Sequence, residues 1–564
     1  MKFTEIKYQR PDIEKIAKNA TSLIETFDCA ASAEEATKAI KEINALRNEY
    51  ESQYAFVRIK HSLNSEDEFF EKENTYFDQI SPKFQGITTK YYQTLMNSKF
   101  KNELIARFGE QLFNIAGCET KSFDPSVEAD LAKENELSSK YNKLTSSAKI
   151  EFDGKTLNLS GLTPYKMSKD RSVRKAANEA YWSFFKENQE EFEKIYDDLV
   201  KVRHQIALKL GYNNFTELGY NRMLRSDYNA DMVANYRAEV LKEVVPLAAS
   251  LIERQAKRIG VAEMTYYDEA LKFLSGNPTP KGEPKWIIEN GKKMYEELSP
   301  ETAEFYQYML DNELMDLETK PGKFPGGYCS YIANYGHPFI FSNFNGTSGD
   351  IDVLTHEAGH AFQVFSSRDY EISEYNWPTY EAAEIHSMSM EFFTWPWMEN
   401  FFKEDTDKYK FAHLSGSILF LPYGVSVDEF QHEVYANPDM TPKERNETWL
   451  RIAKKYMPWT NYGDNEFLNE GGFWMRQLHI YNSPFYYIDY TLAQICAFQF
   501  WVKMQNDYES AWKDYIALCK KGGSQSFLKL VESANLKNPF ETGNLKEVVT
   551  QINEWLSNVD DSKF

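Results

Sequence analysis

The sequence predicts a mostly α-helical protein that carries a small β-sheet. Between residues 32 and 59, apolar side chains recur at intervals of three or four positions, which is the period of an α-helix. These residues are Ala36, Ile40, Ile43 and Leu46. Strand-like alternation is confined to two short regions, near 149–162 and 328–344, and helical patterns occupy most of the remaining chain.

The elements of the first 210 residues follow from local signals. Ser32 and Glu35 form the pattern of a capping box, which predicts that a helix begins there. The stretch 149–162 (KIEFDGKTLNLSGL) alternates around Asp153-Gly154, a pair typical of β-hairpin turns. Helices are predicted to resume at Arg171, with another over Glu190–Leu210.

Beyond residue 210, a loop and a second pair of strands interrupt the helices. The Pro/Gly-rich segment 273–285 is predicted to be a loop or a junction between lobes. Two short strands are predicted at about Tyr328–Ile332 and Pro338–Phe344, with a turn at Tyr335-Gly336. Helices are expected from there to the end of the chain.

The charge balance bears on the class of partner. The 564 residues include 64 Lys and Arg against 85 Asp and Glu, so the net charge is 64 − 85 = −21. No basic stretch is present, and nucleic-acid binding requires clustered cations, so we expect no nucleic-acid partner. The longest apolar stretches fall short of the ~18 residues that span a bilayer, so we expect no membrane partner.

The cysteines and the first residues indicate a cytoplasmic protein. Five cysteines are widely spread and form no CxxC pair, as expected for free thiols in a reducing compartment. The first residues show no apolar run of signal-peptide length.

The strongest chemical signal is an HExxH motif at His356–His360. On a helix, His356 and His360 lie one turn apart on the same face, so both imidazoles can bind one Zn²⁺ ion. Glu357 lies beside the first ligand, where a carboxylate can act as general base. The preceding residues Thr347–Asp350 are expected to cap this helix.

A third zinc ligand must come from elsewhere. A metzincin would have Gly at 363 and His at 366, but this chain has Gln363 and Ser366, which excludes that class. The segment 379–391 has a helical period and offers three glutamates. These are Glu381, Glu384 and Glu391. Spacing alone leaves all three open.

The segments THEAGHAF (355–362) and EAAEIHSMSMEFF (381–393) resemble the thimet oligopeptidase and oligoendopeptidase F family of zinc peptidases. In that family the third ligand opens a Glu-x-x-Ser-x-x-x-Glu pattern. Here the pattern is Glu384, Ser387 and Glu391, so the resemblance implies Glu384 as the ligand. Asp352, one turn before His356, and Glu391 are candidate acceptors for the N–H groups of the ligands.

A second constellation begins at His479. Pro484 is predicted to be the first residue of a helix on which Tyr486 and Tyr490 share a face. Imidazole and phenol groups can donate to the oxyanion that forms during peptide hydrolysis. The family resemblance implies His479 and two of the three tyrosines Tyr486, Tyr487 and Tyr490 in this role. The glycine pair of the thimet branch is replaced by Asn482-Ser483-Pro484, which favours the oligoendopeptidase F branch and leaves the tyrosine register open.

Two further expectations concern the strand 337–345 and the other histidines. As an edge strand, 337–345 could pair with an extended peptide. The remaining histidines have no ligand spacing and are expected to have structural roles. They are His61, His204, His386, His413 and His432.

These residues predict a zinc-dependent oligoendopeptidase with one Zn²⁺ per chain, acting on short unstructured peptides. His356, His360 and Glu384 would leave a fourth zinc position to water, and Glu357 would take a proton as that water attacks. His479 and the tyrosines would hold the oxyanion. The alternatives are a helical zinc carboxypeptidase or dipeptidase, and a helical scaffold whose HExxH is fortuitous.

The resemblance also implies an architecture. It is strongest over 325–500 and implies two helical lobes around a deep substrate channel, with the sheet beside the HExxH helix. We expect helical hairpins in 1–110, an oligoendopeptidase F-like region with the β-hairpin in 111–200, and the catalytic region in 201–564. The sequence leaves the oligomeric state open.

Overall fold

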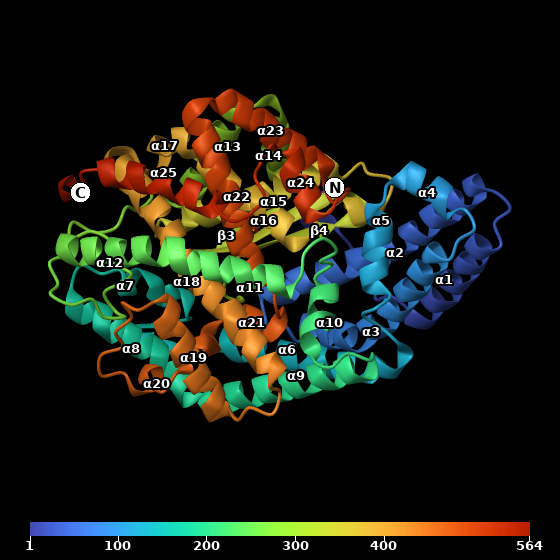
Figure 1. Ribbon diagram of the computed structural model, residues 1–564, viewed down its shortest axis with the longest axis horizontal. Helices are drawn as coiled ribbons and strands as arrows, with labels where there is room; N and C mark the ends of the chain where they lie inside the picture. The colour runs from blue at the N-terminus through green and yellow to red at the C-terminus, as the bar shows by residue number, and fades with distance from the viewer.

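The computed structural model describes residues 1–564 as a largely helical molecule, which confirms the predicted fold class (Figure 1). Its helices are α1 (Ile13–Asp28), α2 (Ala33–Leu63), α3 (Glu68–Met96), α4 (Lys101–Phe108), α5 (Gln111–Glu119), α6 (Glu128–Ser146), α7 (Thr163–Lys166), α8 (Arg171–Glu187), α9 (Gln189–Lys209), α10 (Phe215–Arg222), α11 (Ala230–Glu239), α12 (Val245–Ile259), α13 (Pro284–Leu298), α14 (Pro300–Asp311), α15 (Gly349–Ser367), α16 (Tyr380–Phe393), α17 (Glu399–Phe402), α18 (Thr406–Ala436), α19 (Pro442–Tyr456), α20 (Glu466–Asn469), α21 (Leu478–Asn482), α22 (Tyr487–Asn506), α23 (Tyr508–Lys521), α24 (Phe527–Ser533) and α25 (Asn544–Asn558). The strands are β1 (Ile150–Phe152), β2 (Lys155–Leu157), β3 (Met315–Glu318), β4 (Tyr328–Ile332) and β5 (His337–Phe344).

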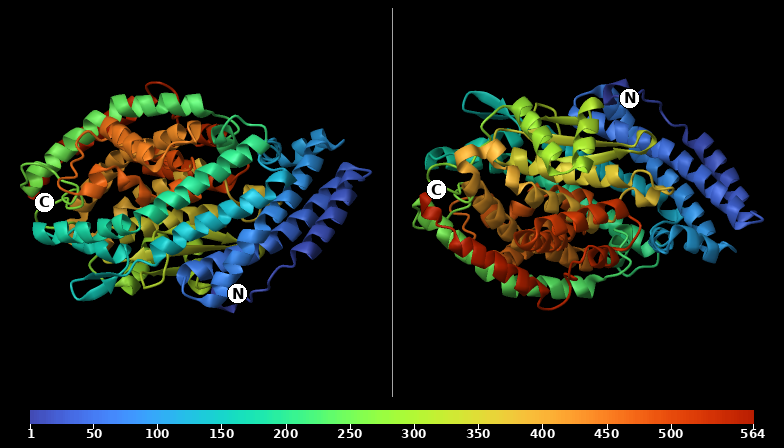
Figure 2. Two further views of the ribbon diagram at one scale, coloured as in Figure 1. Left: turned by 90° about the horizontal axis from the view of Figure 1, so that it is seen from below. Right: turned by 90° about the horizontal axis from the view of Figure 1, so that it is seen from above.

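The N-terminal helices project from the rest of the molecule. Helices α1 and α2 pack together and extend beyond the main body at one end, on the right in Figures 1 and 2. The predicted start of α2 is confirmed, because the Ser32 hydroxyl accepts from the Glu35 N–H at 3.2 Å. The other end of α2 approaches β4, so this helix reaches from the projecting tip to the three-stranded sheet.

The predicted hairpin and the predicted strand pair are both present. Strands β1 and β2 pair antiparallel across Asp153 and Gly154, whose φ angles of 51° and 70° are those of a tight hairpin turn. Strands β4 and β5 also pair antiparallel. Helix α8 begins at Arg171, as predicted, and segment 273–285 lies largely in the loop between α12 and α13.

One expectation about the sheet is wrong. The strand order is β3-β5-β4, because β3 adds to β5 in parallel. Strand β5 is therefore central and both of its edges are occupied, so it cannot accept a peptide. Strand β3 is absent from the prediction, because Met315-Asp316-Leu317-Glu318 alternates apolar and polar residues over only four positions, the shortest run that indicates a strand. The exposed edge next to the HExxH helix belongs to β4.

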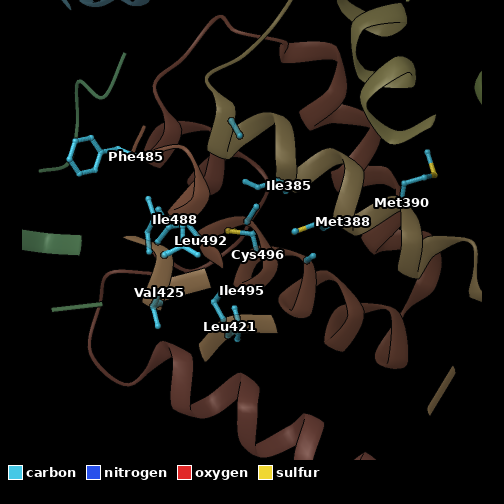
Figure 3. Packing of buried hydrophobic residues seen from close by; sticks show 14 of the residues in the cluster. Ile385, Met388, Met390, Leu421, Val425, Phe485, Ile488, Leu492, Ile495 and Cys496 are labelled. Carbon is cyan, nitrogen blue, oxygen red and sulfur yellow. The ribbon is translucent and has the colours of Figure 1, made fainter. Parts of the chain in front are cut away.

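Helices α15, α16 and α22 form the centre of the core. Residues Ile385 and Met388 of α16 pack near Ile488, Leu492 and Cys496 of α22 (Figure 3). A methyl group added at Gly359 of α15 would lie 2.6 Å from the Cα of Ser387, so glycine permits the close approach of α15 to α16. This contact sets the distance between the HExxH residues and the glutamates of α16.

One predicted helix start and one predicted helix cap are wrong. Pro484 does not begin a helix, because Phe485 adopts a φ of 67° and α22 begins at Tyr487. The Phe485 N–H donates to Gln431 and its carbonyl accepts from Arg225, which holds a turn at this point. Helix α15 has no side-chain cap, and Asp350 instead accepts from two N–H groups of the preceding loop.

No helix has the length and apolar character needed to cross a bilayer.

Candidate metal centre

The structure brings His356, His360 and Glu384 together at the contact between α15 and α16. Glu384 Oε2 lies 3.2 Å from His356 Nε2 and 3.3 Å from His360 Nε2. One ligand atom from each residue falls within 4.8 Å of the others. Two imidazole nitrogens and one carboxylate oxygen form the donor set of a catalytic zinc site, so these residues fit the metal that the sequence predicted.

The other two glutamates of α16 point elsewhere. The Glu381 carboxylate is buried and has no hydrogen-bond partner. Glu391 binds the far side of His356 rather than the cluster. Glu384 is the one glutamate of the three whose carboxylate joins both histidines.

Glu384 is held in its charged form. Its Oε2 accepts from the Ser387 hydroxyl at 2.9 Å, and its Oε1 accepts from the Tyr486 hydroxyl. Burial acts to raise the pKa of Glu384, but His360 and His356 outweigh burial and hold that pKa well below its usual range. An ionised carboxylate is the form that binds a cation.

A chain of hydrogen bonds behind His356 determines which of its nitrogens carries the proton. An indole N–H can only donate, and Trp395 Nε1 donates to His413 Nδ1 at 3.2 Å. His413 therefore carries its proton on Nε2 and donates to Glu391 Oε2 at 2.7 Å. Glu391 Oε1 then accepts from His356 Nδ1 at 2.7 Å. In the neutral imidazole that binds a metal, the proton on Nδ1 would leave the lone pair of His356 Nε2 facing Glu384 and His360.

The hydrogen bonds behind His356 confirm one of the two predicted partners of the ligand histidines and exclude the other. Glu391 contacts a ligand histidine, as the sequence suggested. Asp352 does not, because its carboxylate accepts from Tyr409 at 2.6 Å. Sequence reasoning gave no role at the site to His413 or Trp395, and no spacing signal in the chain could have revealed them.

Glu357 lies beside the cluster with one free oxygen. The residue is 5% exposed, and its Oε2 has no partner. Burial raises the pKa of Glu357 against the opposing charges of His356 and His360. A methyl group added at Gly327 would lie 3.4 Å from Glu357 Oε1, so the start of the β4 edge runs past this carboxylate.

His479 and Tyr490 form a hydrogen-bonded pair with a defined direction. The Tyr423 hydroxyl donates to Gln477 Oε1 at 2.6 Å, and Gln477 Nε2 donates to His479 Nδ1 at 2.7 Å. His479 Nε2 therefore carries the proton and donates to the Tyr490 oxygen at 3.1 Å. Burial lowers the pKa of His479 to about 4, so the imidazole is neutral.

The three tyrosines differ in what they face. Tyr486 reaches Glu384, and its ring lies 4.9 Å from that of Tyr490. The charges of Glu384 and Glu357 both act on the Tyr490 hydroxyl and help to raise its pKa, with burial the largest cause. Tyr487 instead packs its ring 5.6 Å from that of Tyr423. The predicted site residues are thus gathered around one centre, and of the three tyrosines it is Tyr486 that hydrogen-bonds Glu384.

Comparisons with known proteins place the whole chain among peptidases. A solved structure of PZ peptidase A with inhibitor 2 is 56% identical, covers 100% of both chains and has a TM-score of 0.99. The plasmid oligoendopeptidase F of Lactococcus lactis subsp. cremoris is 25% identical over 65% of this chain and 61% of its own length. An oligoendopeptidase F homolog of Borreliella burgdorferi is 24% identical over 66% of this chain and 63% of its own length. The chain thus matches less than two thirds of the length of these two curated relatives.

Two family models match parts of the chain. Residues 3–123 match the peptidase M3 N-terminal domain, and residues 294–550 match peptidase family M3. The second range contains every predicted site residue. The chain belongs to peptidase family M3.

Proposed function

We propose that this protein is a zinc-dependent oligoendopeptidase that hydrolyses internal bonds of short peptides in the cytoplasm. The observation that carries the proposal is the convergence of His356 Nε2, His360 Nε2 and Glu384 Oε2, with the free Glu357 carboxylate beside them. The names of the relatives support the substrate class. When bound by these three ligands, zinc would act as a Lewis acid and lower the pKa of a bound water.

The residues of the chain have distinct tasks in this proposal. Glu357 takes a proton from the attacking water and delivers it to the leaving nitrogen. Its raised pKa helps the first step, because a carboxylate with a raised pKa is a stronger base toward the attacking water. Tyr490 donates its O–H to the oxyanion, which it is free to do because His479 supplies the hydrogen bond that its oxygen accepts.

The edge of β4 is the natural place for the substrate backbone. Its outer N–H and C=O groups are unpaired, and it begins beside Glu357. An extended peptide added there would place a scissile carbonyl between Glu357 and Tyr490. A folded protein cannot add a strand in this way, which favours short unstructured substrates.

Peptide cleavage in the presence and absence of metal tests the proposed function. The purified protein should cleave internal bonds of a peptide blocked at both ends, and o-phenanthroline should abolish cleavage until zinc is restored. Mass analysis of the products identifies the cleaved bond. Cleavage that requires a free terminus would instead indicate a carboxypeptidase or dipeptidase, and the absence of stoichiometric zinc and of cleavage would indicate a scaffold.

Phenylalanine substitutions should distinguish the three tyrosines. Tyr490→Phe removes an oxyanion donor, so we expect kcat to fall by about 10²–10³-fold with little change in KM. Tyr487→Phe is the matched control, because the ring packing against Tyr423 is kept and it is the Tyr486 hydroxyl, not that of Tyr487, that hydrogen-bonds Glu384. An equal loss of kcat in the two variants would contradict the assignment of Tyr490. Steady-state kinetics with one blocked peptide provides the measurement.

A further inference from the structure

Lys166 and Arg476 are cations that lie over the adjacent aromatic rings of Tyr181 and Trp182, and neither has an anionic partner at ion-pair distance. Neither side chain forms an ion pair with a carboxylate, although the chain contains 85 Asp and Glu residues. Both residues are half-buried rather than fully exposed. The positive charge of Arg476 acts on Lys166 and, together with the larger effect of burial, lowers the pKa of Lys166 to about 7. Two unpaired cations at one place oppose each other unless an anion joins them.

Aromatic side chains surround these cations, and the phenol oxygens of Tyr423 and Tyr181 offer Arg476 only neutral acceptors. The Arg476 guanidinium carbon lies 4.4 Å from the ring centre of Phe473 and 5.5 Å from that of Tyr423. The Lys166 ammonium lies 4.0 Å from the ring centre of Tyr181. Ring faces stabilise a cation but accept no strong hydrogen bond. None of the side-chain nitrogens of Lys166 and Arg476 is sealed from solvent.

Arg476 lies next to residues of the candidate active site. Arg476 directly precedes Gln477, which holds His479. Tyr423, beside the guanidinium, donates to Gln477 and packs against Tyr487. The charge of Arg476 acts on the carboxyl of Glu269, but the two form no ion pair, and burial raises the pKa of Glu269 to about 7, so it neutralises Arg476 incompletely. The pair is accessible, cationic and adjacent to the groups proposed to act on the substrate.

We propose that Lys166 and Arg476 bind a carboxylate of the peptide substrate, either its C-terminus or an Asp or Glu side chain. This inference rests on the proposed function. An arginine can grip a carboxylate through two parallel N–H groups, and a lysine adds a point charge. The net negative charge of the protein repels acidic peptides. A local pair of positive side chains would offset this repulsion where the peptide binds.

Kinetics with three matched peptides tests the proposal. The first is neutral and amidated at its C-terminus, the second has the same sequence with a free C-terminal carboxylate, and the third is amidated with one Asp added. The variants are Lys166→Met, Arg476→Met and Arg476→Lys. Lys60→Met is the matched control, because Lys60 also lies over aromatic rings, at 4.7 Å from Phe3, without a carboxylate partner.

We expect Arg476→Met to raise KM for one or both carboxylate peptides by about tenfold, with kcat kept. For the neutral peptide, KM and kcat of Arg476→Met should stay within about twofold of wild type. Lys166→Met should also raise KM for the carboxylate peptides, and Arg476→Lys should restore part of the affinity that Arg476→Met loses. The peptide that is affected identifies the source of the carboxylate. An equal change for all three peptides, or no change for any, would overturn the proposal. Failure of the wild-type protein to cleave even the neutral peptide would instead count against the proposed function.

Discussion

Replacing Glu357 by glutamine is expected to lower kcat by about 10²–10⁴-fold while zinc stays bound. Glutamine keeps the size of the side chain but cannot take a proton from water. The metal should remain because its proposed ligands are His356, His360 and Glu384, and Glu357 Oε2 has no partner in the structure. Steady-state kinetics and metal analysis of the same preparation measure the two effects.

Glu381→Gln is the matched control for this experiment. Glu381 is also a buried carboxyl without a hydrogen-bond partner, one turn before Glu384 on α16. Burial raises its pKa well above the usual range, so its neutral form resembles glutamine. We expect activity within about twofold of wild type. If Glu357→Gln kept more than about 1% of wild-type kcat, Glu357 would not be the general base.

Replacing Glu384 by alanine should remove the metal and, with it, the activity. The change deletes the carboxylate that joins both histidines and leaves the Ser387 and Tyr486 hydroxyls without their acceptor. Two histidines alone bind zinc weakly, so zinc affinity should fall by more than the 10–100-fold typical of residues that support a ligand. Zinc content after dialysis against a competing chelator measures this.

His413→Ala provides a graded comparison. His413 touches Glu391 rather than the metal ligands, so its loss should weaken zinc binding by about 10–100-fold and leave kcat at saturating zinc largely unchanged. If Glu384→Ala still bound a full complement of zinc, the third ligand would have to be another glutamate. If His413→Ala lost more zinc affinity than Glu384→Ala, this would contradict the assignment of Glu384 as a direct ligand and of His413 as a residue that acts through Glu391.

The parts of the site that could be predicted are those encoded within a few residues. His356 and His360 share a face because a helix repeats every 3.6 residues, and Glu357 is their neighbour in sequence. Likewise, the Asp153-Gly154 hairpin is a property of the turn itself. The choice of Glu384 came from a family pattern rather than from spacing, which left Glu381 and Glu391 equally eligible.

What remained open depends on contacts between distant segments. Trp395, His413 and Glu391 form one chain of hydrogen bonds because His413 of α18 reaches both Glu391 at the end of α16 and Trp395 just after it. The orientation of the tyrosines follows from the turn at Phe485, which is held by Gln431 from α18 and by Arg225 from the region after α10. No local pattern encodes a turn that is held by side chains from other elements.

The sequence by itself thus determined the helical class, the hairpin, the β4–β5 pair and the two histidines with their glutamate, all of which depend on local periodicity and spacing. Only the tertiary structure decided that β5 is central and β4 is the edge, that Glu384 faces both histidines, and that Lys166 and Arg476 lie over the adjacent rings of Tyr181 and Trp182. The physical reason is that helix and turn formation depend on neighbouring residues, whereas an active site depends on where close packing places segments that are far apart in the chain.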